Sequence, residues 1–377
     1  MRAFLKKKRF SLEGVREGAK PKKYLASNPP SPRDIFFWMC SFLLLLSSIS
    51  PGSTLPNAES SKATIATSAQ LSFVREFSSA EDVKGFSHPI LNKALDIIAG
   101  PKEPSPPPAS VLLQPHAVTT DSNRRIFVTD ITGGVVHVFD FANHEYWLLG
   151  AGNHLRSPLG IATDRDGNVY VSDSSLRTVF VYDSKGKFLH YLKKPRDNES
   201  YFDAPLGIAI DPATEHIYVC DTPRHMVIIL DKKGHVLATL GKRGGGSAAG
   251  EFKYPTQVAA RAGEIFVLDV GNSRVQILDQ RGQFKREVRL ANVDNRAGLA
   301  VDGAGRVYVT DPEIEHLQAF DHDGHFLYSF GQPGASAGQF NWISGAWVDS
   351  GGCLYVVDSE NKRVQLFQIP GERAGAC

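Results

Sequence analysis

The sequence has few cysteines and lacks most of the short motifs that mark enzymes. Four cysteines occur in 377 residues, and no two are spaced as Cys-x-x-Cys, so neither a zinc ribbon nor a dithiol redox motif is supported. We expect isolated reduced thiols. The sequence contains no phosphate-binding loop and no His-Glu-x-x-His pair. It therefore indicates no catalytic residues, no metal and no cofactor.

Basic charge is also scarce outside the N-terminal tail. The formal net charge is +2, but residues 1–34 carry ten Lys and Arg against three acidic residues. Residues 111–377 carry 27 Lys and Arg against 31 Asp and Glu, a balance of −4. A body that bound nucleic acid would usually show a basic excess, so we expect no nucleic-acid partner.

A single uncharged apolar run follows the basic tail. Residues 35–49 read IFFWMCSFLLLLSSI, and small residues and a proline come next. This arrangement predicts a signal peptide or membrane anchor at 35–50, with the tail at 1–34 in the cytoplasm. We expect the remainder to be exported to the periplasmic or extracellular side. If uncleaved, residues 35–49 would hold it in the inner membrane, and cleavage versus retention stays open.

The segment before the main body is short and varied. Residues 51–70 are rich in Ser, Thr and Ala and predict a disordered spacer. Leu71–Phe77 alternates like a strand, and His88–Ala99 has apolar residues at helical spacing between Ser87 and Gly100. Residues 101–108 form a proline-rich link. We therefore treat 71–109 as one region holding a strand, a short helix and a link.

A five-residue pattern that ends in Asp recurs six times along the body. Each copy is preceded by one strand-like segment and followed by a second, with Gly-bearing turns between them. The intervals of 43, 48, 48, 42 and 47 residues are typical of propeller blades. The copies are IFVTD at Asp130, VYVSD at Asp173, IYVCD at Asp221, IFVLD at Asp269, VYVTD at Asp311 and LYVVD at Asp358.

These repeats predict an all-β, six-bladed β-propeller of four-stranded blades over residues 110–370. The sixth repeat lacks its outer strand, which Leu71–Phe77 resembles, so we expect that strand to close the ring. The P-x-G-I-A-x-D…G-x-V-Y-V-x-D pattern resembles the NHL-repeat family, in particular its bacterial membrane-anchored or secreted members. The linker at Gly241–Thr256 carries the same resemblance. It implies the fold and says little about function, because propellers of this kind include binding modules and one lyase class.

The loops after the repeated Asp residues and the linkers between blades should share one face. Functional residues concentrate on such loops, so this face is the expected binding site. We expect the repeated Asp residues to cap their turns and pair with nearby Arg rather than bind metal. The residues that we expect to contact a ligand are His116, Arg177, Arg224, His225, Arg274, Arg296, Asn341, Trp342 and Arg363.

Histidines decide between a binding module and an enzyme. The resemblance implies that a lyase branch binds zinc through three histidines, and Pro115-His116 and the loop with His225 match two of those positions. The third is missing, and no carboxylate and amide set of the lactonase kind is found. We therefore expect an extracytoplasmic binding platform for a protein, peptide or glycan. The alternative is a metal-dependent propeller enzyme, amidating-lyase-like or lactonase-like, with an axial site.

Overall fold

The computed structural model describes residues 71–84, 110–152, 155–192, 201–291, 293–371 and 377. The chain divides into two units, 1–65 and 66–377, and only the second contains described residues. The predicted tail, apolar segment, spacer, helix at 88–99 and proline-rich link lie outside them. No helix in the described part of the chain has the length and apolar character of a membrane span.

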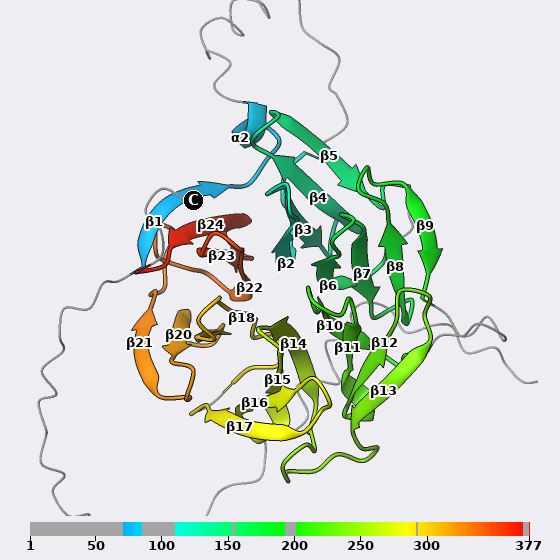
Figure 1. Ribbon diagram of the computed structural model, residues 1–377. Helices are drawn as coiled ribbons and strands as arrows, with labels where there is room; N and C mark the ends of the chain where they lie inside the picture. Colours follow the sequence, from blue (N-terminus) through cyan, green and yellow to red (C-terminus); the bar gives the residue numbers. More distant parts are fainter. Residues whose placement is uncertain (1–70, 85–109, 153–154, 193–200, 292, 372–376) are drawn as a thin grey trace, which may run out of the picture. The chain divides into compact units, whose positions relative to one another are not determined.

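The described residues form six four-stranded antiparallel sheets around one axis (Figure 1). The all-β propeller of six four-stranded blades is therefore confirmed. Blade one consists of β2 (Pro115–Thr120), β3 (Ile126–Asp130), β4 (Val135–Asp140) and β5 (Glu145–Leu149), and blade two of β6 (Pro158–Thr163), β7 (Val169–Asp173), β8 (Thr178–Tyr182) and β9 (Phe188–Tyr191). Blade three consists of β10 (Pro205–Ile210), β11 (Ile217–Asp221), β12 (Met226–Leu230) and β13 (Val236–Gly241), and blade four of β14 (Pro255–Arg261), β15 (Glu264–Asp269), β16 (Arg274–Asp279) and β17 (Phe284–Arg289). Blade five consists of β18 (Leu299–Val301), β19 (Val307–Asp311), β20 (His316–Phe320) and β21 (Phe326–Phe330), and blade six of β22 (Ile343–Val348), β23 (Cys353–Asp358), β24 (Arg363–Gln368) and β1 (Ser72–Phe77).

Helices are few and short. The described part holds the four-residue helix α2 (Glu81–Lys84), which the sequence did not predict, and two 3₁₀ turns. These turns are η1 (Thr222–Arg224) and η2 (Val270–Asn272), and each directly follows a repeated Asp. The helices therefore serve as turns and form no layer of their own.

The core lies between blades. Strands such as β7 and β11 are buried along their whole length, because both faces of a blade pack against a neighbour. Each of six apolar clusters draws residues from two adjacent blades. Stacking thus supplies the apolar burial that a single blade cannot achieve alone.

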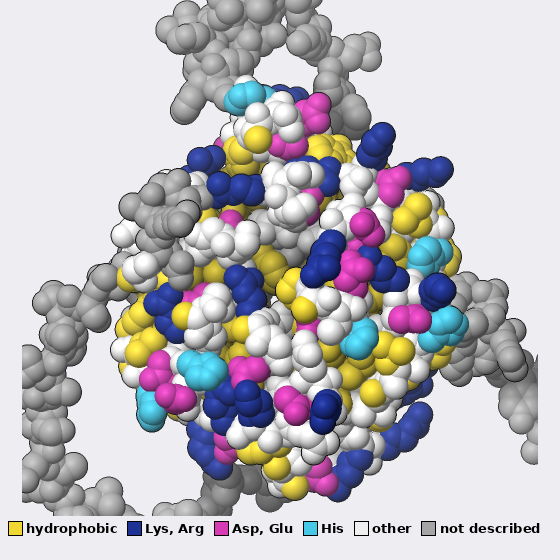
Figure 2. Space-filling view, viewed as in Figure 1, with side chains coloured by type: hydrophobic (Ala, Val, Ile, Leu, Met, Phe, Trp, Pro, Cys, Tyr) yellow, Lys and Arg dark blue, Asp and Glu magenta, His cyan; other side chains and the backbone are white. Residues whose placement is uncertain are grey.

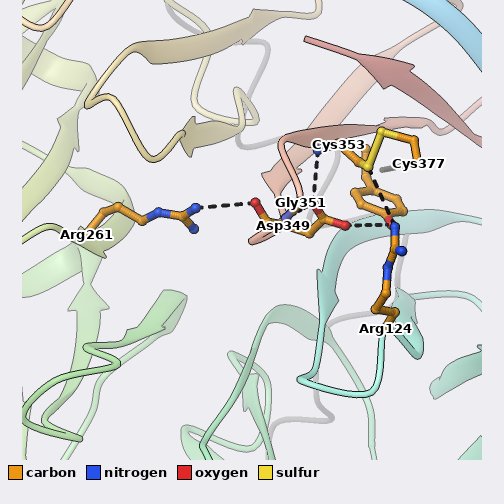
Figure 3. The surroundings of a disulfide bond; sticks show 7 residues. Arg124, Arg261, Asp349, Gly351, Cys353 and Cys377 are labelled. Atoms are coloured by element: carbon orange, nitrogen blue, oxygen red, sulfur yellow. Dashed lines mark hydrogen bonds between the residues drawn. A yellow bond between two sulfur atoms is a disulfide. The ribbon is translucent and has the colours of Figure 1, made fainter. Parts of the chain in front are cut away.

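Small residues let the innermost strands approach closely around the axis. A Cβ at Gly160 would lie 2.3 Å from the Leu206 carbonyl oxygen, and one at Gly345 would lie 2.5 Å from that of His116. The central space is only about 70 Å³. Arg261 reaches across it to the Asp349 carbonyl oxygen at 3.3 Å (Figure 3) and to the Val348 carbonyl oxygen, also at 3.3 Å. The channel is therefore narrow and bridged near one end.

β1 occupies the outer position of the sixth blade. It pairs with β24 in an antiparallel register that runs from Ser72 opposite Gln368 to Phe77 opposite Val364. Phe77 is buried and packs on Phe139 of the first blade, with ring centroids 4.8 Å apart. A strand from before the repeats thus completes the blade that the last repeat leaves short.

The expectation of isolated thiols was wrong for two cysteines. Cys353, the first residue of β23, forms a disulfide with Cys377 (Figure 3), and their Cα atoms are 5.5 Å apart. Spacing could not show this, because the pairing depends on where the chain end meets the sixth blade. Cys220 is a buried free thiol, in line with the prediction, and Cys40 lies outside the described residues.

We predict that the disulfide stabilises the propeller measurably. It closes a loop between residues 24 apart in sequence. Replacing both residues with serine should lower the free energy of unfolding by about 3 kcal/mol, since an open loop raises the entropy of the unfolded chain. Urea denaturation of the full chain measures this. Dithiothreitol should lower the stability of the wild type and leave that of the variant unchanged; a wild type insensitive to reduction would contradict the prediction.

Candidate functional site

The loops after the repeated Asp residues and the linkers that enter each blade meet on one face, which we call the linker face. It comprises the loops at 131–134, 174–177, 222–225, 270–273, 312–315 and 359–362, and the linkers at 111–114, 155–157, 201–204, 242–254, 293–298 and 331–342. In every loop the fourth residue after the Asp has a left-handed backbone with φ between 50° and 61°. These residues are Gly134, Arg177, His225, Ser273, Glu315 and Lys362.

The repeated Asp side chains hold this face together. They are at most 7% exposed. Asp173 accepts the linker N–H groups of Arg156 at 2.6 Å and Ser157 at 3.0 Å, and also the loop N–H of Leu176 at 2.9 Å. Similar bonds join Asp130, Asp221, Asp269 and Asp358 to their linkers. The predicted turn-capping role is confirmed for Asp173 and for Asp130, which accepts the loop N–H of Gly133, whereas the bonds to the linkers were not predicted.

Hydrogen bonding also keeps one of these carboxylates ionised. Burial of Asp130 raises its pKa, but hydrogen bonds from His137 and from the N–H groups of Gly133, Leu113 and Gln114 outweigh that effect. The net result is a pKa below the ordinary value. His137 in turn lies 2.7 Å from the Tyr146 hydroxyl through Nδ1.

Arg274 and Arg363 are buried and serve the linkers. Nε of Arg363 donates to Asp358 at 2.8 Å, and Nη2 donates to the carbonyl oxygens of Ser336 and Gln339 at 3.0 Å each. Its Nη1 pairs with Glu76 at 2.6 Å. Arg274 repeats this pattern with Asp269, Glu287 and the carbonyl oxygens of Ala248 and Glu251. These two guanidiniums are structural ties, and little of either reaches the surface.

Two further residue types take part in these ties: the asparagines, which the sequence places in the same loops as the arginines, and the glutamines, which the sequence reasoning missed. The side-chain amides of Gln276 and Gln365 donate to the same linkers and accept an N–H from Gly250 and Gly338. Asn272 and Asn361 donate to Gly246 and Gly334. The shared Asn-x-Arg-Val-Gln spacing after Asp269 and Asp358 is the signal that could have revealed the glutamines.

Arg177 and Arg224 meet on one carboxylate. Asp203 accepts from Arg177 Nη2 at 2.5 Å and from Arg224 Nε at 2.8 Å. The hydrogen bond from Arg224 is the largest cause that holds the pKa of Asp203 below its usual value. Arg224 also lies 3.2 Å from Asp221. The structure thus brings this pair together around the linker at 201–204.

Arg296 and Trp342 form a half-buried pair at the mouth of the axis. The guanidinium carbon of Arg296 lies 3.8 Å from the centroid of the Trp342 ring. Nε of Arg296 pairs with Asp294 at 2.8 Å, and 41% of the Arg296 side chain remains exposed. The backbone N–H of Trp342 donates to the Glu315 carboxylate at 2.8 Å, and this bond fixes the backbone at the start of β22. Asn341 is exposed, and its N–H donates to Asp358.

His116 belongs to this mouth as well. Its Nδ1 lies 2.9 Å from the Leu159 carbonyl oxygen, so Nδ1 carries the proton and donates. Burial lowers the pKa of His116, the Leu159 bond opposes this in part, and the charge of Arg296 lowers the pKa further. A neutral imidazole with an unprotonated Nε2 follows. His116, Arg296 and Trp342 come from blade one, from the linker into blade five and from the linker into blade six; blade six adjoins the other two, and we call the three residues the mouth cluster.

His225 has a different setting. Its Nδ1 accepts the Tyr254 N–H at 3.0 Å, and its ring meets the Tyr254 ring edge to face at 4.4 Å. Both line a hollow of about 330 Å³ together with Gly244–Gly246, Lys253 and Asn272. Within the described residues no three His, Cys, Asp or Glu side chains are grouped as a metal ion requires. The donors in the described part of the chain do not fit the zinc site of the lyase resemblance.

One serine motif was overlooked in the sequence. Gly334-Ala-Ser336-Ala-Gly338 has the spacing of a nucleophile elbow. It lies in the linker between β21 and β22, with no helix after it. The Ser336 N–H donates to Gln339 at 3.1 Å, and its carbonyl oxygen accepts from Arg363. The segment is a linker turn and does not form the strand-to-helix elbow of a hydrolase.

Comparison with known proteins shows a propeller with local NHL-repeat similarity. No protein-family model matches the chain. Over 87 residues it is 33% identical to human NHL repeat-containing protein 3, covering 22% of this chain and 25% of that protein. The chain thus spans about a quarter of that relative's length.

Solved structures with similar folds have low sequence identity. A Bacteroides thetaiotaomicron protein of unknown function is 15% identical, with a TM-score of 0.55 over 69% of this chain and 70% of its own. Kuenenia stuttgartiensis hydrazine synthase is 13% identical, with a TM-score of 0.50 over 72% and 99%. Virginiamycin B lyase of Staphylococcus aureus, at 9% identity over 68% and 80%, scores 0.49. These matches show the fold alone, and the lyase match carries no implication for activity.

We predict that Arg363→Gln destabilises the propeller and that Lys362→Gln does not. Arg363 is 7% exposed and anchors Asp358, Glu76 and the last linker, whereas Lys362 is exposed. Removing one partner of a buried ion pair should lower the free energy of unfolding by about 3 kcal/mol. Urea denaturation of both full-length variants measures the difference. Equal stability of the two would show that Arg363 is not a structural tie.

Proposed function

We propose that this protein is a binding platform that holds a protein, peptide or glycan partner on its linker face through the mouth cluster. The observation that carries the proposal is the half-exposed Arg296 stacked on Trp342. Arg and Trp are the residue types most enriched where binding energy concentrates. The buried Asp ties hold the surrounding backbone in place, so little ordering is needed when a partner binds.

Charge on the body favours a partner other than nucleic acid. Acidic and basic side chains are interspersed over the visible face (Figure 2). The cationic side chains Arg177, Arg224, Arg274 and Arg363 are already paired with carboxylates. Arg296 is paired as well, with Asp294, but 41% of its side chain stays exposed beside the Trp342 ring, which suits a protein or peptide with one acidic group.

We also propose that the propeller is exported. The apolar run at 35–49 after a basic tail supports this proposal, and so does the Cys353–Cys377 disulfide, because such bonds persist in oxidising compartments. Retention of the run would tether the propeller to the membrane, and β1 would then join the tether to the sixth blade.

The partner proposal predicts face-specific cross-linking. A photo-cross-linking amino acid at Asn341 of the full chain should give discrete adducts in cells, and one at Asp323, in an opposite hairpin turn, should not. Arg296→Gln with Trp342→Ala should reduce the adducts about tenfold or more, since both residues contribute at the centre of the contact. Immunoblotting measures the yield. Equal adducts from both positions, or adducts that persist in the double variant, would contradict the proposal.

The export proposal predicts activity of a reporter that folds only outside the cytoplasm. Alkaline phosphatase fused after residue 70 should be active in a bacterial host, because its own disulfides form only after export. Deleting residues 35–49 should abolish the activity, and deleting residues 51–65 should not. Enzymatic assay of whole cells distinguishes these cases. Activity without the apolar run would count against export by this segment.

A further inference from the structure

The hollow of about 330 Å³ beside His225 lies on the linker face, over the junction of blades three and four. His225 comes from the loop after β11, Asn272 comes from the loop after β15, and the linker between β13 and β14 supplies residues 244–247, Lys253 and Tyr254. The volume falls in the range of about 300–1,000 Å³ in which proteins bind small organic molecules. The hollow shares no residue with the mouth cluster.

Tyr254 gives the hollow an aromatic wall that a ligand can reach. The residue is 48% exposed, and its φ of 56° is a left-handed conformation that is uncommon for a bulky side chain. Backbone strain of this kind concentrates at functional positions. The backbone that carries the ring is held on both sides, because His225 Nδ1 accepts the Tyr254 N–H at 3.0 Å and the Lys253 N–H donates to Asp269 at 2.6 Å. Little ordering is therefore needed when a ligand covers the ring.

The side chains around this ring can hydrogen-bond to a polar ligand. Because His225 Nδ1 accepts an N–H, the imidazole is neutral with its proton on Nε2, and Nε2 has no partner among the described residues. Gly245 lets the linker pass close to this ring, since a Cβ there would lie 3.2 Å from His225 Cγ. Asn272 donates Nδ2 to Gly246 and Asp269 at 2.8 Å each, which leaves its Oδ1 as an acceptor.

Lys253 adds a positive charge that no carboxylate offsets within the described part of the chain. The residue is exposed, and its ammonium forms no ion pair there. Glu251 in the same linker pairs with Lys242, and Asp269 at the end of β15 pairs with Arg274. Among the described residues, no acidic side chain lines the hollow. The charge at the hollow therefore favours an anionic ligand.

We propose that this hollow binds an acidic sugar, a hexuronic acid unit of a glycan. The apolar C–H face of the pyranose ring would stack on Tyr254, and the carboxylate would pair with Lys253. Hydroxyl groups of the sugar would accept from His225 Nε2 and donate to Asn272 Oδ1. An acidic side chain of a peptide would satisfy Lys253 but would leave the aromatic ring uncovered. The site does not depend on partner binding at the mouth cluster.

The test titrates D-glucuronate into the full chain and follows binding by saturation-transfer-difference NMR of the sugar signals. D-Glucose has the same ring without the carboxylate, so its dissociation constant should be about tenfold higher or more. Acetate has the charge without the ring, so it should also bind about tenfold more weakly or worse, because nothing stacks on Tyr254. Glucose or acetate binding as tightly as glucuronate, or glucuronate showing no saturable binding, would overturn the proposal.

Variants locate the sugar in the hollow. Tyr254→Ala and Lys253→Gln should each weaken glucuronate binding about tenfold, through loss of the stacked ring and of a charge-assisted hydrogen bond. Tyr254→Phe and Lys253→Arg keep the ring and the charge and should retain most of the affinity, which guards against a folding defect. The control Lys185→Gln removes an exposed lysine from the turn between β8 and β9 and should bind like the wild type.

A double variant separates this site from the mouth cluster. Arg296→Gln with Trp342→Ala should bind glucuronate like the wild type, whether or not the partner of the mouth cluster is lost. An affinity that falls in this double variant and is unchanged in Tyr254→Ala and Lys253→Gln would place the sugar at the mouth and overturn the assignment to the hollow.

Discussion

The linker face depends on one interaction: a buried carboxylate at the end of each blade's second strand that accepts backbone N–H groups. In five of the six blades the carboxylate takes an N–H from the linker just before the innermost strand, as Asp173 does with Arg156 and Ser157. A buried acceptor left without donors would be costly, so the linker is held wherever the blade folds. The backbone of the face is thus fixed by the same contacts that complete each blade.

This arrangement separates the backbone of the loops from their side chains. The fourth residue after each repeated Asp is left-handed in all six loops, although its identity runs from Gly134 to His225, Glu315 and Lys362. Side chains there can differ because the turn is fixed by the Asp and the following strand. His225 and Glu315 use the position to accept the N–H of Tyr254 and Trp342 in the next linker. Neighbouring blades are thereby joined at the surface as well as in the core.

The periodic part of the structure could be predicted from the sequence, and the non-periodic part could not. Six copies of one strand pattern determine the blades, and Gly-bearing turns such as Asp321–Gly324 form as expected, with Asp321 accepting the N–H groups of Asp323 and His325. The Cys353–Cys377 bond occurs once and carries no repeat signal. The roles of arginines such as Arg274 depend on which carboxylate and carbonyl oxygens surround them, and that is set by packing between segments.

The fifth blade shows why Arg296 differs from the arginines that became ties. Within the described residues, Asp311 accepts only the N–H of Glu313, which lies in its own loop. It therefore accepts no N–H from the linker that precedes β18. That linker is held instead by Asp294, which accepts both the N–H and the Nε of Arg296. Because its carboxylate lies two residues away, Arg296 stays at the surface, and its flat face remains over Trp342. An arginine that pairs with a repeated Asp, as Arg274 and Arg363 do, is buried and has a structural role. Arg296 pairs within its own linker, so part of its side chain stays exposed to a partner.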